Sequence, residues 1–302
     1  MSEKKVFATP KIRKFARELG ANIAEVEGTE RAGRITEEDV KNYINNKLNK
    51  SSINDEIKIK KEFEHSEFGN VEIIDMPRVK RLAAPHLSNS WNTIPHVTHH
   101  DEADITELED FRAKLTDSVS GDKIKITPLA FIAKALANNL KKFPRFNSSI
   151  DNISEGKITL KKYFHIGIAV DTPHGLMVPK IRNVDQMKIK EIAEELKNVS
   201  ELSRSLKINK KEFFGGSITI TSLGGIGGTY FTPIINYPEV AILGVGRSYK
   251  KQIFIKDKFL ARTVLPLSLS YDHRIIDGAE AAKFCNLLKE NLGKNFAYNL
   301  AF

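Results

Sequence analysis

The stretch "LPLSLSYDHRIIDG", residues 265–278, ends an apolar strand at a histidine in a charged loop. Leu265, Leu267 and Leu269 alternate with a proline and two serines, so the pattern predicts a strand with one apolar face. His273 follows this strand directly, between an aspartate and an arginine. A rigid strand end holds an imidazole in one orientation and leaves its second nitrogen open to a substrate.

This position makes His273 a candidate general base. A histidine side chain titrates near pH 6.5, so its neutral form takes a proton from a thiol of pKa about 8.5 near neutral pH. A structural role is the ordinary alternative for a lone histidine. The residues alone therefore indicate proton transfer without naming a reaction.

Length and composition are typical of two folded units in a reducing compartment. The chain has 302 residues, 41% of them hydrophobic, and no apolar run approaches the roughly 20 residues of a membrane-spanning helix. The start, "MSEKKVFATP", has neither a secretory nor an organellar targeting pattern. We therefore expect a cytoplasmic protein without a membrane segment, with its one cysteine, Cys285, reduced and in the core.

Charge and histidine spacing argue against two other classes of function. The net charge of +9 is spread thinly, without a Lys/Arg-rich block that interleaves aromatic residues, so nucleic-acid binding is not expected. In "HVTHH", His96 and His100 would lie roughly 13 Å apart on a strand while His99 points to the other face. No metal site is expected there.

The pattern of the chain changes twice, which predicts two domains and a linker. Residues 6–47 read as a small all-α unit with capped helices, starting at Thr9-Pro10 and again at Thr36. Residues 48–70 are polar and weakly patterned, as a linker is. Residues 71–302 alternate strands and helices, and several strands follow one another without a helix, which predicts a mixed, mostly antiparallel sheet.

Several segments resemble one known family. "LPLSLSYDHRIIDG" resembles the His-x-x-x-Asp-Gly signature of the dihydrolipoamide acyltransferase components of 2-oxo acid dehydrogenase complexes. "IGIAVDTPHGLMVPKI" and "SITITSLGGIGGTYFTPIINYPEVAILGVG" are similar to that family too, and "ATPKIRKFARELGANIAEVEGTERAGRITEEDV" is similar to its peripheral subunit-binding domain. The resemblance implies a chloramphenicol-acetyltransferase-like α/β catalytic domain behind a small all-α subunit-binding domain.

The resemblance also assigns roles to individual residues. His273 matches the base that deprotonates a thiol, and Asp277 matches the acid that fixes the histidine loop through an ion pair. Thr221, in "TITSLGG", matches the hydroxyl that donates to the tetrahedral oxyanion, and Asp171 matches a neighbour of that hydroxyl at the substrate. A plain strand-forming role for Thr221 stays open. The family builds this site between subunits of a trimer, so His273 is expected to face Thr221 of the next chain.

Partners and cofactors follow from the same resemblance. Coenzyme A is the expected substrate, and the lipoyl group is expected on a separate domain or chain because the sequence opens on the subunit-binding domain. Trimers are expected to join into a larger core through an apolar C-terminus ending in Leu300 and Phe302. The small domain is expected to bind dihydrolipoamide dehydrogenase or the 2-oxo acid decarboxylase component through its basic residues Arg13, Lys14, Arg17, Arg31 and Arg34.

The predicted function is therefore transfer of an acyl group, expected to be acetyl, between dihydrolipoamide and coenzyme A. Succinyl and branched-chain acyl groups stay open at this point, as does the partner enzyme that binds residues 6–47. A non-catalytic scaffold that recruits the dehydrogenase is the alternative from another class. A free-standing acetyltransferase is a third reading, which leaves the subunit-binding domain unexplained.

Overall fold

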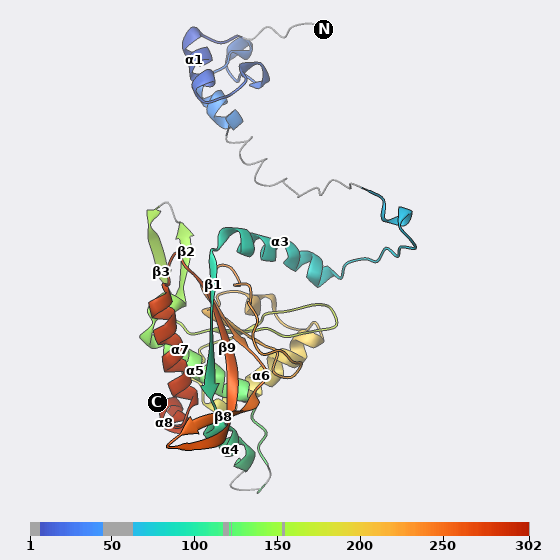
Figure 1. Cartoon of the computed structure of the whole chain (residues 1–302). Coiled ribbons are helices and arrows are strands. Elements are labelled where there is room, and N and C mark those ends of the chain that lie inside the picture. Colours follow the sequence, from blue (N-terminus) through green and yellow to red (C-terminus); the bar gives the residue numbers. More distant parts are fainter. Residues whose placement is uncertain (1–6, 45–62, 117–120, 122, 153–154, 302) are drawn as a thin grey trace. The chain divides into compact units, whose positions relative to one another are not determined.

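The computed structural model describes residues 7–44, 63–116, 121, 123–152 and 155–301 (Figure 1). Internal contacts divide the chain into two compact units, Met1–Ile74 and Asp75–Phe302. Most of the predicted linker, residues 48–62, lies outside the described residues.

The small unit begins as its capping signals predict. Helix α1, Pro10–Glu18, starts after Thr9, whose hydroxyl accepts a hydrogen bond from Ile12 N at 3.4 Å. The chain leaves the helix through Gly20 at φ +69°, a conformation that glycine adopts without strain. A helical turn at Ile23–Glu25 and a helix over residues 37–44 follow. Their apolar side chains close one small core with α1, formed by Ile12, Ala16, Val26, Ile35 and Val40.

Asp39 ties the loop of this unit to its second helix. Its buried carboxylate accepts hydrogen bonds from Thr36 N at 2.8 Å, from Thr29 Oγ1 at 2.8 Å and from Thr29 N at 3.2 Å. In return the Thr36 hydroxyl accepts from Asp39 N, which completes the predicted cap. The bond from Thr36 N is the largest cause that lowers the pKa of Asp39 to about 2, with Thr29 adding to it and burial opposing it.

The larger unit is built on a seven-stranded sheet with helices packed against it (Figure 1). The strand order is β1-β9-β7-β6-β4-β5, and β8 pairs with β9 outside this path. Pairs β6–β7 and β4–β6 are parallel and the other four are antiparallel, which confirms the predicted mixed, mostly antiparallel sheet. The strands of this sheet are β1 (His96–Asp104), β4 (Ile166–Ile168), β5 (Lys180–Ile181), β6 (Ile218–Ser222), β7 (Ala241–Val245), β8 (Tyr249–Ile255) and β9 (Lys258–Asp272).

Strand β9 is the longest and organises the sheet. Its first half pairs with β8, and its second half lies between β1 and β7. The predicted alternation is confirmed, because Leu265, Leu267 and Leu269 are buried in the main core. Ser268 and Ser270 point to the opposite face, where they bond to side chains of β1. One face of the sheet is therefore apolar and the other polar.

Helices cover the apolar face, and α5 and α7 form the centre of this layer. Helix α7 packs against β1, while α5 packs against α6, α7 and α8. Cys285 of α7 is 1% exposed, and burial is the main cause that raises the pKa of its thiol to about 12. The predicted core position of this cysteine is confirmed, and its thiol stays protonated near neutral pH. The helices of this unit are α3 (Arg78–Thr93), α4 (Thr106–Lys114), α5 (Pro128–Lys142), α6 (Ile189–Arg204), α7 (Gly278–Leu292) and α8 (Phe296–Ala301).

Helix α3 and the hairpin of β2 and β3 leave little signal in the sequence. Helix α3 carries Pro85 inside it and has a single buried residue, Ser90, so neither a clean start signal nor an apolar stripe marks it. Strands β2 (Ser148–Asn152) and β3 (Lys157–Leu160) form a separate hairpin whose second strand is exposed throughout. Both elements lack the buried periodicity on which sequence reasoning depends.

The C-terminus differs from the expectation of an exposed apolar tail. Leu300 is only 4% exposed, because α8 folds back onto α5 and α7 and places this leucine in the chain's own core. Phe302 lies outside the described residues. The expectation for Leu300 was therefore wrong, since this side chain packs into the core of its own chain.

The buried carboxylate of Asp39 predicts an acid-sensitive small unit. Its folded pKa lies below the unfolded value near 3.8, so its stabilisation is complete above about pH 4 and is lost as the pH falls toward 2. Asp39→Ala should cost the unit about 2 kcal/mol at pH 7 and much less near pH 2. Thermal unfolding followed through the NMR signals of residues 7–44 checks this. The exposed neighbour variant Glu38→Ala is the control, and equal effects of both variants at pH 7 would contradict the assignment.

Candidate active site

The backbone around His273 is held on every side while its side chain faces outward. Strand β9 ends at Asp272, whose N–H donates to Val240 O at 2.9 Å. The N–H of His273 donates to Pro95 O at 3.1 Å, and the next turn closes with Ile276 N donating to Asp272 O. The His273 side chain is exposed. The predicted geometry of a fixed backbone and an open imidazole is therefore present.

Asp272 and Arg274 form the ion pair that shapes this loop. The Asp272 carboxylate is 2% exposed, and Arg274 grips both of its oxygens, with Nε 2.9 Å from Oδ1 and NH2 2.5 Å from Oδ2. The hydrogen bond to Asp272 is the main cause that raises the pKa of Arg274. A two-point contact of this kind fixes both the distance and the plane of the guanidinium. The pair thus fixes the two residues that flank His273.

Asp277 has a different role from the one expected. Its side chain accepts a hydrogen bond from Glu280 N at 2.8 Å and caps helix α7. Within the described part of the chain, Asp277 forms no ion pair. The expected ion pair is replaced by that of Asp272 with Arg274, because a strand-end carboxylate two residues before the arginine lies in its reach. Asp277 still acts on the loop, since its cap sets where α7 begins.

Thr221 and Asp171 lie at the ends of two neighbouring parallel strands. Thr221 is half-buried on β6, opposite Gly244 of β7. Ile168 of β4 pairs with Ile220 of β6, so Asp171 leaves the same end of the sheet three residues later. Asp171 is exposed, at the start of a tight turn in which the Thr172 hydroxyl donates to Gly175 O. The structure therefore brings these two predicted residues to one edge.

A single chain does not bring His273 to Thr221. The register places Thr221 opposite Gly244, and Gly244 opposite Ser268 of β9. His273 lies five residues beyond Ser268, which is about 16 Å along the strand, and two strand spacings add roughly 10 Å across the sheet. Neither side chain spans such a distance. Each chain thus carries these two predicted groups, called the candidate half-sites below, at different ends of its sheet.

The five basic residues predicted to contact a partner are exposed on the small unit. The guanidinium groups of Arg13 and Arg17 donate to backbone carbonyls at 3.3 and 3.4 Å, and Lys14 lies 3.8 Å from Glu18. Arg31 and Arg34 flank Gly33, which has φ +73°, and no ion pair of either residue occurs within the described part of the chain. Gly28 makes this loop possible, since a Cβ there would lie 2.4 Å from Gly33 O.

Two of the three histidines of β1, His96 and His100, have structural partners. His96 Nε2 accepts from Ile235 N at 3.0 Å, and His100 Nδ1 lies 2.9 Å from Ser268 Oγ. In the described ranges, no three His, Cys, Asp or Glu side chains gather as a metal site would require. Within the same residues, no helix combines the length and the apolar character that a bilayer crossing requires.

Two charged pairs near the half-sites were missed by sequence reasoning. One is Asp272 with Arg274, which the sequence shows only as charges flanking the histidine. The other is Lys180 with Glu239, whose side chains are almost fully buried. A signal for this second pair exists in the sequence, because "MVPKI" and "YPEVAILGV" each place one charge against an apolar run. A charge in such a position needs a buried partner of opposite sign.

Comparison with known proteins gives matches over both units. Residues 68–298 match the model of the 2-oxoacid dehydrogenases acyltransferase catalytic domain, and residues 6–41 match that of the e3 binding domain. The chain is 46% identical over 294 residues to the dihydrolipoyllysine-residue acetyltransferase component of the pyruvate dehydrogenase complex of Cupriavidus necator. This match covers 93% of the chain and 53% of the relative. The same component of Haemophilus influenzae is 43% identical over 93% of the chain and 52% of its own length. The chain thus spans about half the length of these curated relatives.

Solved structures are similar to the larger unit. The cubic core of a pyruvate dehydrogenase multienzyme complex aligns with a TM-score of 0.75 at 44% identity, over 80% of this chain and 98% of the other. An Azotobacter vinelandii dihydrolipoamide acetyltransferase aligns with the same TM-score, identity and coverage. That structure addresses the role of a serine, a histidine and an asparagine in its catalytic mechanism.

The ion pair beside His273 predicts a loss of stability that is specific to this loop. Arg274→Gln leaves the buried Asp272 carboxylate without its cation, which should lower the free energy of unfolding by about 2 kcal/mol. Arg145→Gln is the control, because the Arg145 side chain is 55% exposed and its pair with Glu280 should contribute less than about 1 kcal/mol. Urea unfolding followed by circular dichroism measures both variants, and indistinguishable midpoints would refute the role of the Asp272 pair.

Proposed function

Because the chain belongs to the 2-oxoacid dehydrogenase acyltransferase family, we propose that it transfers an acetyl group between dihydrolipoamide and coenzyme A. The predicted family and the α/β fold of the catalytic unit are confirmed by the matches over residues 68–298. The observation that carries the proposal is the placement of His273, whose backbone and that of the preceding Asp272 are bonded to two other segments while its imidazole stays exposed. This is the geometry that a general base requires.

Residue intervals support the choice of catalytic residues. In the Azotobacter vinelandii enzyme, the intervals between the serine, the histidine and the asparagine equal those between Thr221, His273 and Asp277 here. Threonine in place of serine keeps the hydroxyl that donates to an oxyanion. Aspartate in place of asparagine keeps an oxygen acceptor, which in this chain caps α7. We assign His273 as the base, Thr221 as the oxyanion donor and Asp277 as a positioning residue of the loop.

The chemistry follows from these assignments. Neutral His273 accepts the proton of one thiol, and the resulting thiolate attacks the carbonyl carbon of the acetyl thioester. The Thr221 hydroxyl donates to the oxygen of the tetrahedral intermediate, which carries the negative charge. When the intermediate collapses, the carbon–sulfur bond to the second thiol breaks and protonated His273 returns its proton to that sulfur. Asp171, at the same edge as Thr221, is proposed to contact the bound substrate.

The complete site requires a second copy of the chain. His273 and Thr221 lie too far apart in one chain to act together, so we propose that His273 meets Thr221 of a neighbouring copy in a trimer. The similar solved structure belongs to a cubic core, and assembly of these trimers into a larger core is proposed on that basis. In this arrangement a monomer holds the parts of two sites and completes neither.

Acetyl is the proposed acyl group, and the lipoyl group is proposed to reside on another domain or chain. The similar curated proteins are acetyltransferase components of pyruvate dehydrogenase complexes, which favours acetyl over succinyl or branched-chain groups. Residues 6–47 are proposed as the subunit-binding domain, 48–70 as the linker and 71–302 as the catalytic domain. The match to an e3 binding domain supports dihydrolipoamide dehydrogenase as the partner of the small unit. Its exposed contacts are proposed to be Arg13, Lys14, Arg17, Arg31 and Arg34.

Loss of the base should abolish turnover. His273→Ala should lower kcat for transfer from acetyl-CoA to dihydrolipoamide by at least about 10³-fold, because no other described group at this strand end replaces the imidazole. His65→Ala, which removes an exposed histidine outside the catalytic unit, should leave the rate unchanged. The assay follows free coenzyme A released. No turnover by the wild type would favour the scaffold function instead.

A shared site predicts rescue between two inactive chains. His273→Ala and Thr221→Ala variants should each be impaired, the second by about 10²–10³-fold. Mixed trimers made by co-expression should recover about a quarter of wild-type activity, because a fraction of the interfaces pairs an intact histidine with an intact threonine. Activity of the mixture no higher than the average of the two single variants would place the whole site within one chain.

A further inference from the structure

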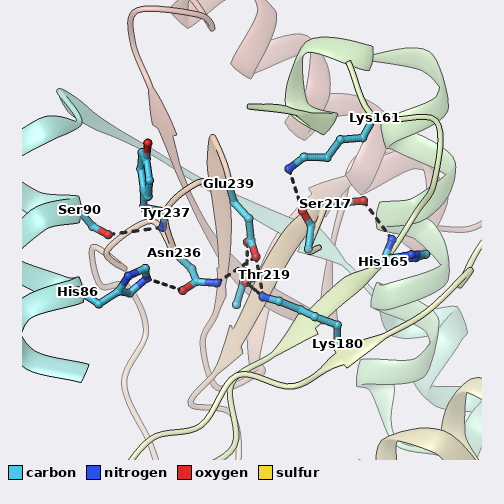
Figure 2. Close-up of polar contacts among 11 residues, drawn as sticks. His86, Ser90, Lys161, His165, Lys180, Ser217, Thr219, Asn236, Tyr237 and Glu239 are labelled. Carbon is cyan, nitrogen blue, oxygen red and sulfur yellow. Dashed lines mark hydrogen bonds and ion pairs between the residues drawn. The ribbon is translucent and has the colours of Figure 1, made fainter. Parts of the chain in front are cut away.

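The buried pair of Lys180 and Glu239 lies between the two half-sites of one chain. Lys180 Nζ lies 2.6 Å from Glu239 Oε1, and the two side chains are 1% and 2% exposed. Thr219 Oγ1 donates to the other carboxylate oxygen at 2.6 Å, and Asn236 Nδ2 donates to Oε1 at 3.0 Å. Figure 2 shows these four side chains meeting at one point, with each carboxylate oxygen bonded. We call Lys180, Thr219 and Glu239 the buried cluster.

The backbone leaves room for the buried cluster at two glycines. A Cβ at Gly216 would lie 2.2 Å from Glu239 Oε1 and 2.7 Å from Lys180 Cε. A Cβ at Gly167 would lie 2.5 Å from Thr219 Oγ1 and 2.7 Å from Lys180 Nζ. Any larger residue at either position would displace the ion pair. The strands β4, β5 and β6 are therefore built around this cluster.

Glu239 of the buried cluster is connected to His273 through the backbone. Glu239 directly precedes Val240, and Val240 O accepts the N–H of Asp272 at 2.9 Å. Asp272 is the residue before His273 and the partner of Arg274. Movement of the Glu239 side chain would therefore shift Val240 and, through one backbone hydrogen bond, the strand end that carries the imidazole.

Thr219 of the buried cluster is connected to Thr221 along strand β6. Thr219 lies two residues before Thr221 on β6, so the two side chains point to the same face of the sheet. Thr219 pairs with Gly167 on one side and with Ile242 on the other. Lys180 also donates to Thr219 Oγ1, at 3.3 Å. The hydroxyl of Thr219 therefore joins the Thr221 strand to the carboxylate that sets the His273 loop.

The buried cluster also reaches helix α3. The Asn236 side chain donates to Glu239 and lies 3.1 Å from His86 Nε2, and Tyr237 N donates to Ser90 Oγ at 3.4 Å (Figure 2). These contacts hold the segment before β7 between the sheet and α3. This segment has no regular secondary structure of its own, so side-chain bonds supply the support that a strand ladder would give.

We propose that the buried cluster of Lys180, Thr219 and Glu239 is a positioning device that sets both half-sites of one chain relative to each other. The proposal rests on the proposed acetyl transfer. In this proposal, none of the three residues contacts the reacting atoms. Thr219 acts through the backbone of β6 and Glu239 through the segment before β7, while Lys180 on β5 holds both side chains. Loss of any of the three should therefore reduce turnover more than substrate binding.

A single hydroxyl provides the sharpest test. Thr219→Val keeps the shape and removes the donor to Glu239, and it should lower kcat about tenfold while both KM values stay within about twofold. Thr219→Ser keeps the donor and should retain kcat within about twofold. The assay uses the full chain with acetyl-CoA and dihydrolipoamide. Equal losses in the two variants, or a wild-type kcat in Thr219→Val, would overturn the proposal.

A paired variant removes the charges without leaving one of them buried alone. Lys180→Met combined with Glu239→Gln should fold, because replacing both partners avoids an unpaired buried charge. Its kcat should fall about tenfold or more. The same exchange at an exposed pair of α6, Lys197→Met with Glu201→Gln, is the control and should leave kcat unchanged. A double variant of the buried pair that matches this control would overturn the proposal.

Hydrogen exchange separates this proposal from the proposed function. Peptides covering residues 270–277 should exchange faster in Thr219→Val and in the double variant, while peptides of α5 and α7 keep their protection. If the wild type transfers no acetyl group, the proposed function fails, and this local change still supports the positioning role. Unchanged exchange at 270–277, or a loss of protection throughout the catalytic unit, would show that the cluster is not a positioning device.

Discussion

The pairing register of β9 with β1 and β7 is the constraint on which the rest of the molecule depends. It sets the apolar side chains of β9 against α5 and α7 and turns its serines to the opposite face. A slip of one residue would exchange the two faces and bury the polar set in the core. The same register places Thr221 and His273 at different ends of the sheet. Core formation and the division of the site are thus consequences of one set of hydrogen bonds.

The polar face of the sheet supports segments that have no ladder of their own. Ser268 accepts from Phe231 N, His96 accepts from Ile235 N, and Glu239 is held by the sheet residues Thr219 and Lys180. Because buried polar groups are costly when unpaired, these bonds fix the path of the chain between β6 and β7 closely. The end of that path lies beside the strand end that carries His273. The polar residues on this face therefore fix the positions of the segments that pack against it, although the same residues would destabilise an apolar core.

The proposed division of the site between the ends of one sheet would link catalysis to assembly. Each half-site is rigid by itself, since one is a strand end fixed by an ion pair and the other lies on two parallel strands. What one chain lacks is their proximity, and a neighbouring copy is proposed to supply it. The small unit, with its own core and exposed arginines, is suited to recruit a partner independently of this arrangement. Rigid half-sites, and not flexible loops, are what allow such an interface to align reacting groups.

Local patterns in the sequence determined the elements with strong periodicity or caps. Strand β1, the start of α1 and the alternating faces of β9 lie where the residues predicted them, because side-chain spacing and capping act within a few residues. Resemblance to a known family supplied the candidate residues His273, Thr221, Asp277 and Asp171. Only the tertiary structure decided that Lys180 meets Glu239, and that Thr221 and His273 lie at different ends of the sheet. Both outcomes depend on contacts between segments far apart in the chain, such as Lys180 and Glu239, which are 59 residues apart. A pattern within a few residues shows that such a charge needs a partner but does not show which residue is the partner.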